Sequence, residues 1–477
     1  MLPADDAEEV LDEDGNEDAA MDSDDDNEEV ILQSDAIAYF DHAPPDSSLF
    51  AIAQHPRIDR LIAVGGSAGS SDEAPGAGWI FRIPQGPVLP ESYASGGKDG
   101  KGMKTQMESL FHLDGHEDSI SALCWTLPRG EVLLSAGLDG RLRAWKTSVE
   151  DGGDVKASFL AERREVEEIN WLIPLPTTSS SPQRPTTIAL GASDGSVWVY
   201  EVNADATDEL QDSLRIIQFY YLHTASSTAG AWSPDGSLLA TVSEDGSLFV
   251  WDVWADPSAP TTVVSMTDAD QRFAVDGGLF SVTFDPNGGF VAVGGAQGII
   301  KIVSLPRLTT ISSSSSSTSS GGQVLATLQA QTDSIESLST SRPSPTITLL
   351  ASGSVDGTIA IFDATRRFAV RRLIPSAHDG LSVVSVDFLP AGDDEKDNDG
   401  KNQPWLLDSC GLDGVLRRWD LRASPSSAEH DAAPLREWRG HRGGDDGAGG
   451  ILGFVRTPGG RRIVTAGDDG IALVFEA

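Results

Sequence analysis

One pattern recurs along most of the chain: a strand of small and apolar residues, an X-Asp-Gly turn, and a second strand that ends in an aromatic residue. The clear copies read LLSAGLDGRLRAW, IALGASDGSVWVY, LATVSEDGSLFVW, LASGSVDGTIAIF, LDSCGLDGVLRRW and IVTAGDDGIALVF, and a weaker one reads VAVGGAQGIIKIV. In each copy the turn residue precedes the strand-end residue by six positions, as from Asp139 to Trp145 and from Asp469 to Phe475. Six is an even step, so both residues lie on one face of a strand. This repetition indicates a repeat protein.

Each copy belongs to a longer unit of about four strands. Pro-Asp-Gly and Pro-Asn-Gly turns, as in STAGAWSPDGSLLA and LFSVTFDPNGGFVAV, mark a tight hairpin before the repeated pattern. Four antiparallel strands make one blade of a β-propeller. A degraded first copy, SLFAIAQHPRIDRLIAVGG followed by GWIFRIP, has Phe81 in the aromatic position and brings the number of units to eight. The sequence therefore predicts an all-β fold, an eight-bladed WD40 β-propeller.

The propeller is expected to occupy residues 30–477. Low-complexity inserts explain why successive turn residues lie 51 to 59 positions apart, which exceeds the usual spacing of roughly 40–45 residues. The segment 30–40 has no repeat of its own, so we expect it to supply the outer strand of the last blade and close the ring. The repeats are predicted near residues 48–84, 115–147, 165–202, 223–253, 277–306, 333–364, 378–422 and 440–477.

Negative charge dominates the composition. Residues 1–29 contain fifteen Asp and Glu and no Lys or Arg, which predicts a disordered acidic tail. The net charge is −39, so the rest of the chain still carries −24. This sign disfavours direct binding to nucleic acids or to anionic membranes and favours a cationic partner, with mere solubility as the alternative.

The remaining composition favours a cytoplasmic protein, which we also expect to be a monomer. An apolar run of about eighteen residues is missing, and the acidic N-terminus argues against a secretory signal. The two cysteines show no metal-ligand spacing and suit a reducing compartment. We expect a cytoplasmic protein, and the sequence leaves entry into the nucleus open.

His, Ser or Thr, Asp and Trp recur at similar offsets in three repeats. The sets are His116, Ser135, Asp139 and Trp145; His223, Thr241, Asp245 and Trp251; and His378, Ser409, Asp413 and Trp419. An active site needs one such set, whereas a structural network can recur from blade to blade. We expect the Asp to accept from the His, and the His to connect to the hydroxyl and the Trp. Glycine-rich phosphate loops and metal spacings are also missing, so the chain is predicted not to be an enzyme and to need no cofactor.

Acidic residues fall on positions that should face the centre of the ring. The residue before the turn Asp gives Glu244 and Asp468, and the start of the innermost strand gives Glu165, Glu167 and Glu336. Such a rim would attract a cationic segment and speed its capture. The alternative is that these residues are ordinary solvated loop acids.

Several segments, taken in order, resemble one lineage of WD-repeat proteins. They are the acidic N-terminal run, AIAYFDHAPPDSSLFAIAQHP, EVEEINWLIP, ATVSEDGSLFVWDV, GGFVAVGGAQGIIKIVSL, DSIESL with SGSVDGTIAIFDA, and SCGLDGVLRRWD. This lineage is the angio-associated migratory cell protein family, whose fungal members are dedicated ribosome-assembly chaperones of the large-subunit ribosomal protein L-ten.

The resemblance implies that an acidic propeller face captures the basic N-terminal segment of the newly made ribosomal protein and that the client is then handed to the pre-60S particle. It also implies that the five rim acids named above contact this client. The long Ser-rich and acidic inserts depart from the compact family pattern. Two rival interpretations are a general WD-repeat scaffold in signalling, migration or trafficking, and an acidic histone-chaperone propeller. The second usually carries a long N-terminal helix, and residues 1–29 lack a helical apolar period.

Overall fold

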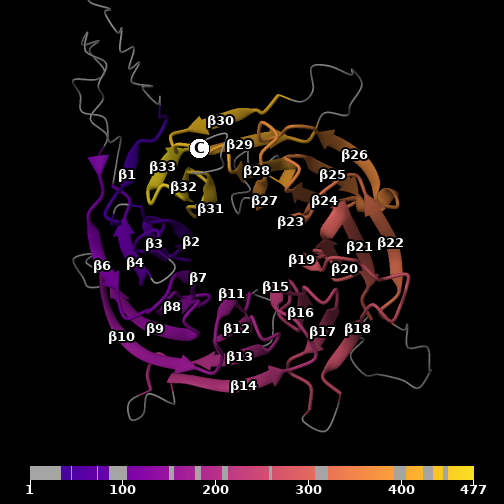
Figure 1. The fold of residues 1–477 in the computed structure, drawn as a ribbon, viewed down its shortest axis with the longest axis horizontal. Coiled ribbons are helices and arrows are strands. Elements are labelled where there is room, and N and C mark those ends of the chain that lie inside the picture. Colours follow the sequence, from indigo (N-terminus) through magenta and orange to yellow (C-terminus); the bar gives the residue numbers. More distant parts are fainter. Residues whose placement is uncertain are drawn as a thin grey trace, which may run out of the picture. The chain divides into compact units, whose positions relative to one another are not determined.

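Eight β-sheets surround a common centre in the computed structural model of the protein, and this confirms the predicted all-β eight-bladed propeller (Figure 1). The predicted acidic tail, residues 1–29, lies outside the described residues. Within the described part no helix is long and apolar enough to cross a membrane. The structure describes residues 34–44, 46–71, 74–84, 105–149, 155–177, 184–206, 213–256, 260–306, 321–390, 404–422, 433–443 and 449–477.

Blades 1 to 4 each contain four strands, and the order along the chain is also the order from the innermost strand to the outermost. Blade 1 has β2 (Leu49–Gln54), β3 (Leu61–Ser67), β4 (Gly76–Arg82) and β6 (Ser109–Leu113). Blade 2 has β7 (Ile120–Trp125), β8 (Val132–Gly137), β9 (Arg141–Val149) and β10 (Val155–Arg164). Blade 3 has β11 (Ile169–Pro174), β12 (Thr187–Ala192), β13 (Val197–Val202) and β14 (Leu214–Tyr220). Blade 4 has β15 (Ser227–Trp232), β16 (Leu238–Ser243), β17 (Leu248–Asp252) and β18 (Thr262–Met266).

Blades 5 to 7 follow the same order. Blade 5 has β19 (Leu279–Phe284), β20 (Phe290–Gly295), β21 (Ile299–Ser304) and β22 (Val324–Gln329). Blade 6 has β23 (Ile335–Ser344), β24 (Ile347–Ser354), β25 (Ile359–Asp363) and β26 (Ala369–Ile374). Blade 7 has β27 (Val383–Phe388), β28 (Leu406–Gly411), β29 (Val415–Asp420) and β30 (Arg436–Arg439).

Blade 8 combines the two ends of the propeller. Its strands β31 (Ile451–Arg456), β32 (Arg462–Gly467) and β33 (Ala472–Glu476) are completed by β1 (Ala38–Phe40), which pairs antiparallel with β33, and by β5 (Thr105–Gln106), which pairs parallel with β1. The buried ring of Phe40 also stacks on Phe81 of blade 1, with centroids 4.6 Å apart. The first described strand therefore ties the last blade to the first.

The second strand of each blade forms the centre of the core. Every residue is buried in β3, β8, β12, β16 and β20. Both faces of each sheet are covered by neighbouring blades, so these strands read as continuous apolar or small runs rather than as alternating ones. This is why the strand before each X-Asp-Gly turn was so regular in the sequence.

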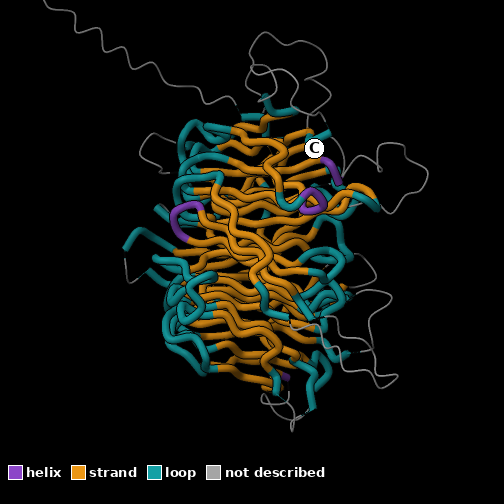
Figure 2. Tube along the Cα trace, turned by 90° about the vertical axis from the view of Figure 1, so that its right-hand side faces the viewer, coloured by secondary structure: helices purple, strands orange, loops and turns teal. Residues whose placement is uncertain are grey.

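The loops gather at two faces of the ring, and the strands run between them (Figure 2). We call one of them the Asp-turn face, because it carries the X-Asp-Gly turns between second and third strands. The connections from each outermost strand to the next innermost strand lie on this face as well. The opposite face, with the other two turns of each blade, is called the hairpin face. At Gly140 the turn has φ 73°, and an added Cβ would lie 2.1 Å from the carbonyl oxygen of Val166, so only glycine fits there.

Candidate functional site

The polar set of blade 2 forms one buried network. Nδ1 of His116 lies 3.2 Å from both carboxylate oxygens of Asp139, and its Nε2 lies 2.8 Å from Ser135 Oγ. The indole N–H of Trp145 donates to the same hydroxyl at 3.1 Å. Burial opposes ionisation of Asp139, but hydrogen bonds from His116 and from two backbone N–H groups outweigh it and hold the pKa of this carboxyl below its ordinary value. A network this enclosed stabilises the turn and offers no access to a substrate.

Blade 7 repeats the network and adds a cation to it. Nδ1 of His378 lies 2.8 Å from Asp413, and Nε2 lies 2.8 Å from Ser409 Oγ, to which Trp419 donates at 2.9 Å. The guanidinium of Arg417 donates to the same Asp413 carboxylate. This Arg follows the turn Asp by four positions and was not singled out in the sequence.

Blade 4 differs from the expected arrangement. Asp245 lies 4.0 Å from His223, because the hydroxyl of Ser247 stands between them, 2.6 Å from Nδ1 of the ring. His223 Nε2 lies 2.9 Å from Thr241 Oγ1, which also accepts from Trp251 at 3.0 Å. The direct contact between His and Asp predicted from the sequence is therefore replaced in blade 4 by a contact through serine.

Sequence reasoning missed two further versions of this network. In blade 8, Nδ1 of His441 lies 3.0 Å from Asp469, and its Nε2 lies 2.7 Å from Thr465 Oγ1. In blade 6, Gln331 takes the place of the histidine and exchanges hydrogen bonds with Ser352. The Gly-His pair at 440–441 matches the one at 115–116 and was the available signal.

On the Asp-turn face, one backbone hydrogen bond recurs in every blade and links the turn to the connection beside it. The residue before each turn Asp donates its N–H to the carbonyl of the residue just before the innermost strand, as Glu244 does to Ser226 at 3.1 Å and Asp468 to Gly450 at 2.9 Å. The other donor and acceptor pairs are Ser67 and Ser48, Leu138 and Ser119, Ser193 and Glu168, Ala296 and Gly278, Val355 and Ser334, and Leu412 and Ser382. Turns and connections thus form one continuous surface around the centre.

Four of the five acids chosen from the sequence are exposed on this surface. Glu165 and Glu167 lie in the connection between β10 and β11, Glu244 lies in a turn, and Glu336 is the second residue of β23. Within the described residues none of these side chains has a hydrogen bond or an ion pair. Further exposed acids without such a partner in the described chain share the face, among them Glu168, which sequence reasoning missed, and Asp276. We call these six residues the acidic rim.

Asp468 behaves differently from the acidic rim. Its carboxylate accepts from the hydroxyl of Ser48 and, at 3.3 Å, from the N–H of Gly449. The bond from Ser48 joins blade 8 to blade 1, so the carboxylate contributes to ring closure. Although Asp468 lies on the predicted face, it has less acceptor capacity left for a partner than Glu244 at the same position of the repeat.

Glu336 lies in surroundings that disfavour its negative charge. The side chain is open to solvent, yet the surrounding protein and the nearby carboxylate of Asp333 raise its pKa above the ordinary value. Both causes disfavour the negative charge, and a bound cation would offset the repulsion between the two carboxylates. Glu336 and Asp333 together present a basic side chain with more negative charge than an isolated surface acid does.

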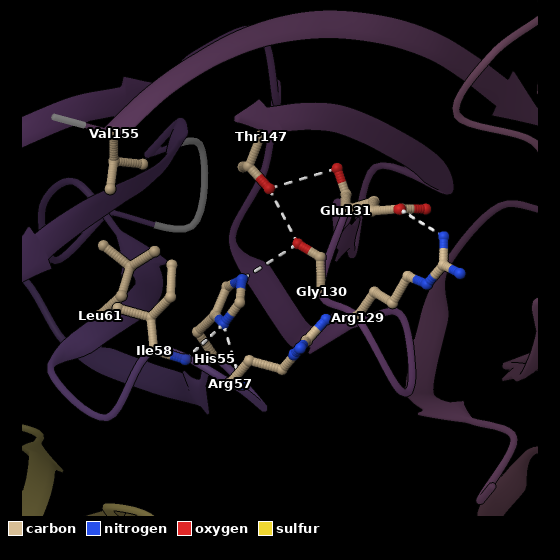
Figure 3. Close-up of a pocket in the computed structure, with 9 residues that line it drawn as sticks. All are labelled: His55, Arg57, Ile58, Leu61, Arg129, Gly130, Glu131, Thr147 and Val155. Carbon is tan, nitrogen blue, oxygen red and sulfur yellow. Dashed lines mark hydrogen bonds and ion pairs between the residues drawn. The ribbon is translucent and has the colours of Figure 1, made fainter. Parts of the chain in front are cut away.

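A pocket of about 290 Å³ lies on the hairpin face between blades 1 and 2 (Figure 3). Nδ1 of His55 accepts the N–H groups of Arg57 and Ile58 at 3.1 and 3.0 Å, and Nε2 faces the carbonyl of Gly130 at 3.2 Å. Burial lowers the pKa of His55 to about 4, so this ring is neutral at neutral pH. Arg57 and Arg129 also line the pocket, and its one acid, Glu131, lies 3.3 Å from Arg129, so the pocket suits a basic segment less well than the acidic rim does.

Comparisons with known proteins agree with this architecture. Residues 107–146, 215–252 and 322–363 match the WD domain, G-beta repeat family. The crystal structure of Sqt1 from Chaetomium thermophilum is 48% identical, has a TM-score of 0.78, and covers 93% of this chain and 98% of that one. A crystal structure of the same protein bound to the N-terminus of the ribosomal protein L10 is 47% identical, with a TM-score of 0.77 and coverage of 93% and 100%.

Two further relatives extend the comparison. The ribosome assembly protein SQT1 of Saccharomyces cerevisiae is 25% identical over 97% of this chain and 92% of that protein. An uncharacterised WD repeat-containing protein of Schizosaccharomyces pombe is 31% identical, and that match spans 55% of each chain. The fungal lineage inferred from the sequence is confirmed, because near-complete coverage and almost half identity connect this chain to a solved member: the chain belongs to the Sqt1 family of WD-repeat proteins.

Proposed function

We propose that this protein is a ribosome-assembly chaperone that binds the N-terminal segment of ribosomal protein L10 on its Asp-turn face. The observation that carries the proposal is the acidic rim: six exposed carboxylates on one face, none of which has a partner in the described chain. The client is suggested by the Chaetomium thermophilum relative, whose structure holds this segment. A binding role also fits the His networks, which are buried and structural.

The chemistry of capture follows from the rim. Lys and Arg side chains of the client form charge-assisted hydrogen bonds with the free carboxylates. Glu165, Glu167 and Glu168 occupy one connection, Glu244 and Asp276 lie on blade 4 and on the connection to blade 5, and Glu336 lies on blade 6. An added Cβ at Gly278 would lie 2.8 Å from the carbonyl of Glu244, so the blade 4 turn and this connection are in direct contact. The rim therefore runs over blades 3 to 6 and suits an extended basic segment.

Release is built into the same interaction. Salt screens exposed charge pairs, and other polyanions compete with the acidic rim for the basic client. The chaperone would hold the client in the cytoplasm and yield it at the pre-60S particle, where RNA offers a denser negative surface. The specific contacts of Glu165, Glu167, Glu244 and Glu336 with the client are part of this proposal, and Asp468 is retained as a peripheral contact because its carboxylate is already shared with Ser48.

Titration of the full-length protein with a synthetic peptide of the L10 N-terminus tests the proposal. We expect binding at low salt and a loss of affinity of more than tenfold between 50 and 300 mM salt, on the order expected when several charge pairs are screened. Calorimetry at several ionic strengths gives this slope. A peptide that fails to bind at low salt, or that binds with an affinity indifferent to salt, contradicts the chaperone role and favours the general scaffold.

A further inference from the structure

Three aromatic rings meet at the outer edge of blade 3. The centroid of Trp198 lies 5.6 Å from that of Phe219 and 5.8 Å from that of Tyr221, and Phe219 and Tyr221 are 5.7 Å apart. Trp198 is buried as the floor of the group, whereas Phe219 and Tyr221 are each 57% exposed. Exposed aromatic rings that pack on one another and leave their faces to solvent are a common recognition surface.

Blade 2 contains a similar ring pair, with a cation over it. Trp145 and Phe159 are direct partners on the third and fourth strands, with centroids 5.6 Å apart, as Trp198 and Phe219 are in blade 3. The guanidinium of Arg143 lies over both blade 2 rings, 5.3 Å and 4.7 Å from their centroids. Its charge is paired with the carboxylate of Glu162. The protein thus places a cation on an aromatic pair and anchors it with an acid.

Blade 3 has the rings and the acids without a cation over the rings, because the guanidinium of Arg163, which lines the same small cavity as Glu165 and Trp198, donates to the carbonyl of Leu214. Arg143 follows the turn Asp139 by four positions, and Trp198 follows the turn Asp194 by the same number, so blade 3 has a ring at the repeat position where blade 2 has the cation. In the described part of the chain no guanidinium or ammonium group lies over Trp198, Phe219 or Tyr221.

Two carboxylates lie near these rings: Glu165 lines the same small cavity as Trp198, and Asp194 accepts from the Ser196 hydroxyl, which in turn accepts the indole N–H of Trp198. Partial burial, together with the negative charges of Asp194 and Glu165, raises the pKa of the Tyr221 phenol, in keeping with this placement of the two acids. Glu165 has no partner in the described chain, and Asp194 uses one oxygen for Ser196. Negative charge beside the rings strengthens their attraction for a cation.

We propose that Trp198, Phe219, Tyr221, Glu165 and Asp194 form a subsite for one Arg or Lys side chain of the client segment. This inference rests on the proposed chaperone function and adds a position to the acidic rim, which it joins at Glu165. The incoming side chain lies on the exposed faces of Phe219 and Tyr221 and donates to the two carboxylates, as Arg143 does with its own rings and Glu162. An aromatic subsite selects a basic residue at one point of a client, whereas carboxylates alone accept any positive segment.

The double variant F219L/Y221L tests the subsite, because leucine keeps apolar area and removes the ring face. With the L10 N-terminal peptide as the probe, we expect the affinity of the full-length variant to fall roughly two- to thirtyfold, the range of a cation on an aromatic face. The matched control is F159L on blade 2, whose ring is already covered by Arg143, and its affinity should equal that of the wild type. Thermal unfolding checks that the exposed substitutions leave the fold intact, and Y221S repeats the test with a single change.

Peptides with one Arg or Lys at a time replaced by Gln complete the cycle. At one basic position the replacement should weaken binding of the peptide to the wild type but should weaken its binding to F219L/Y221L only slightly. The reason is that the peptide change and the protein change remove the same contact. Equal affinities of wild type and F219L/Y221L for the unmodified peptide overturn the subsite and leave the chaperone function standing. Absence of binding to the wild type overturns both.

Discussion

The carboxylates of the acidic rim are exposed and unpaired in the described chain, whereas those between blades 7 and 8 are paired with arginines. Asp408 is completely buried on β28, and its two oxygens accept from Arg418 at 2.7 Å and from Arg456 at 2.7 Å. Arg456 reaches from β31 and also contacts Asp387 at 2.8 Å. The rim acids have no such cations in the described chain. A buried carboxylate between two guanidinium groups serves the fold, and an exposed carboxylate without a partner is available to another molecule.

This difference shows that the acids behind the net charge of −39 do not all serve the same purpose. On the hairpin face, Asp59 lies 3.8 Å from Arg60, Glu131 lies 3.3 Å from Arg129, and Asp205 lies 3.1 Å from Lys146. The Asp-turn face also contains paired acids, Glu117 with Arg141 and Asp270 with Arg272. What distinguishes the rim from both is the lack of a partner rather than the presence of an acid.

The largest effect is expected from breaking the buried group. Asp408→Asn removes the negative charge that Arg418 and Arg456 share and leaves both guanidinium groups buried. We expect the unfolding free energy to fall by about 3–5 kcal/mol. Asp387→Asn is the matched control, since it removes an exposed partner of the same Arg456 and should cost less than about 1 kcal/mol. Chemical denaturation measures both. Similar losses in the two variants would show that the burial of Asp408 contributes nothing.

A second effect concerns pH. Burial lowers the pKa of His223 to about 4, below its unfolded value of 6.5, so its contribution to stability is complete above pH 6.5 and is lost as the pH falls toward 4. The loss amounts to roughly 3 kcal/mol. His223→Gln, which imitates Gln331 of blade 6, should flatten the pH dependence by this amount. Denaturation at pH 7.5, 5.5 and 4.5 gives the curves, and parallel curves for the two proteins would contradict the buried neutral histidine.

The smallest effect is expected at the rim itself. The triple variant E165Q/E167Q/E336Q removes charges that stabilise nothing within the described chain, so the unfolding free energy should stay within about 0.5 kcal/mol of the wild type. Thermal and chemical denaturation of the two proteins side by side check this. A clear destabilisation would mean that these acids have structural partners, and the comparison with Asp408 would then fail.

Much of the fold could be predicted because the repeat is local. The six-residue spacing, the turn glycine and the buried second strand depend on neighbouring residues, and these identified eight blades. The His networks were predicted only in part. His441 was missed although its 28-position distance to Asp469 lies between the 23 of His116 and Asp139 and the 35 of His378 and Asp413, which were both predicted. In blade 4 a hydroxyl two positions after the Asp altered the contact.

The candidate site was predicted only in part, because pairing depends on distant residues. Glu244 and Asp468 hold the same position in the repeat, yet Asp468 is occupied by Ser48, 420 positions away in the chain. The rings of Phe219 and Tyr221 were missed because they belong to the outermost strand of blade 3 and the connection after it, which lie outside the repeated pattern. Sequence periodicity places a residue on a face, and tertiary structure decides whether its side chain is free.

The most direct test of the free rim as a client site is a pair of charge-reversal variants. E165K/E167K/E336K changes three rim acids, and D59K/E131K/D205K makes the same change in charge on the hairpin face. We predict that the first variant loses binding of the L10 N-terminal peptide by at least about a hundredfold, because three attractive contacts become repulsive, and that the second stays within about threefold of the wild type, because screening weakens distant charges. Equal losses in both variants, or unchanged binding by the rim variant, would contradict a client site on the rim.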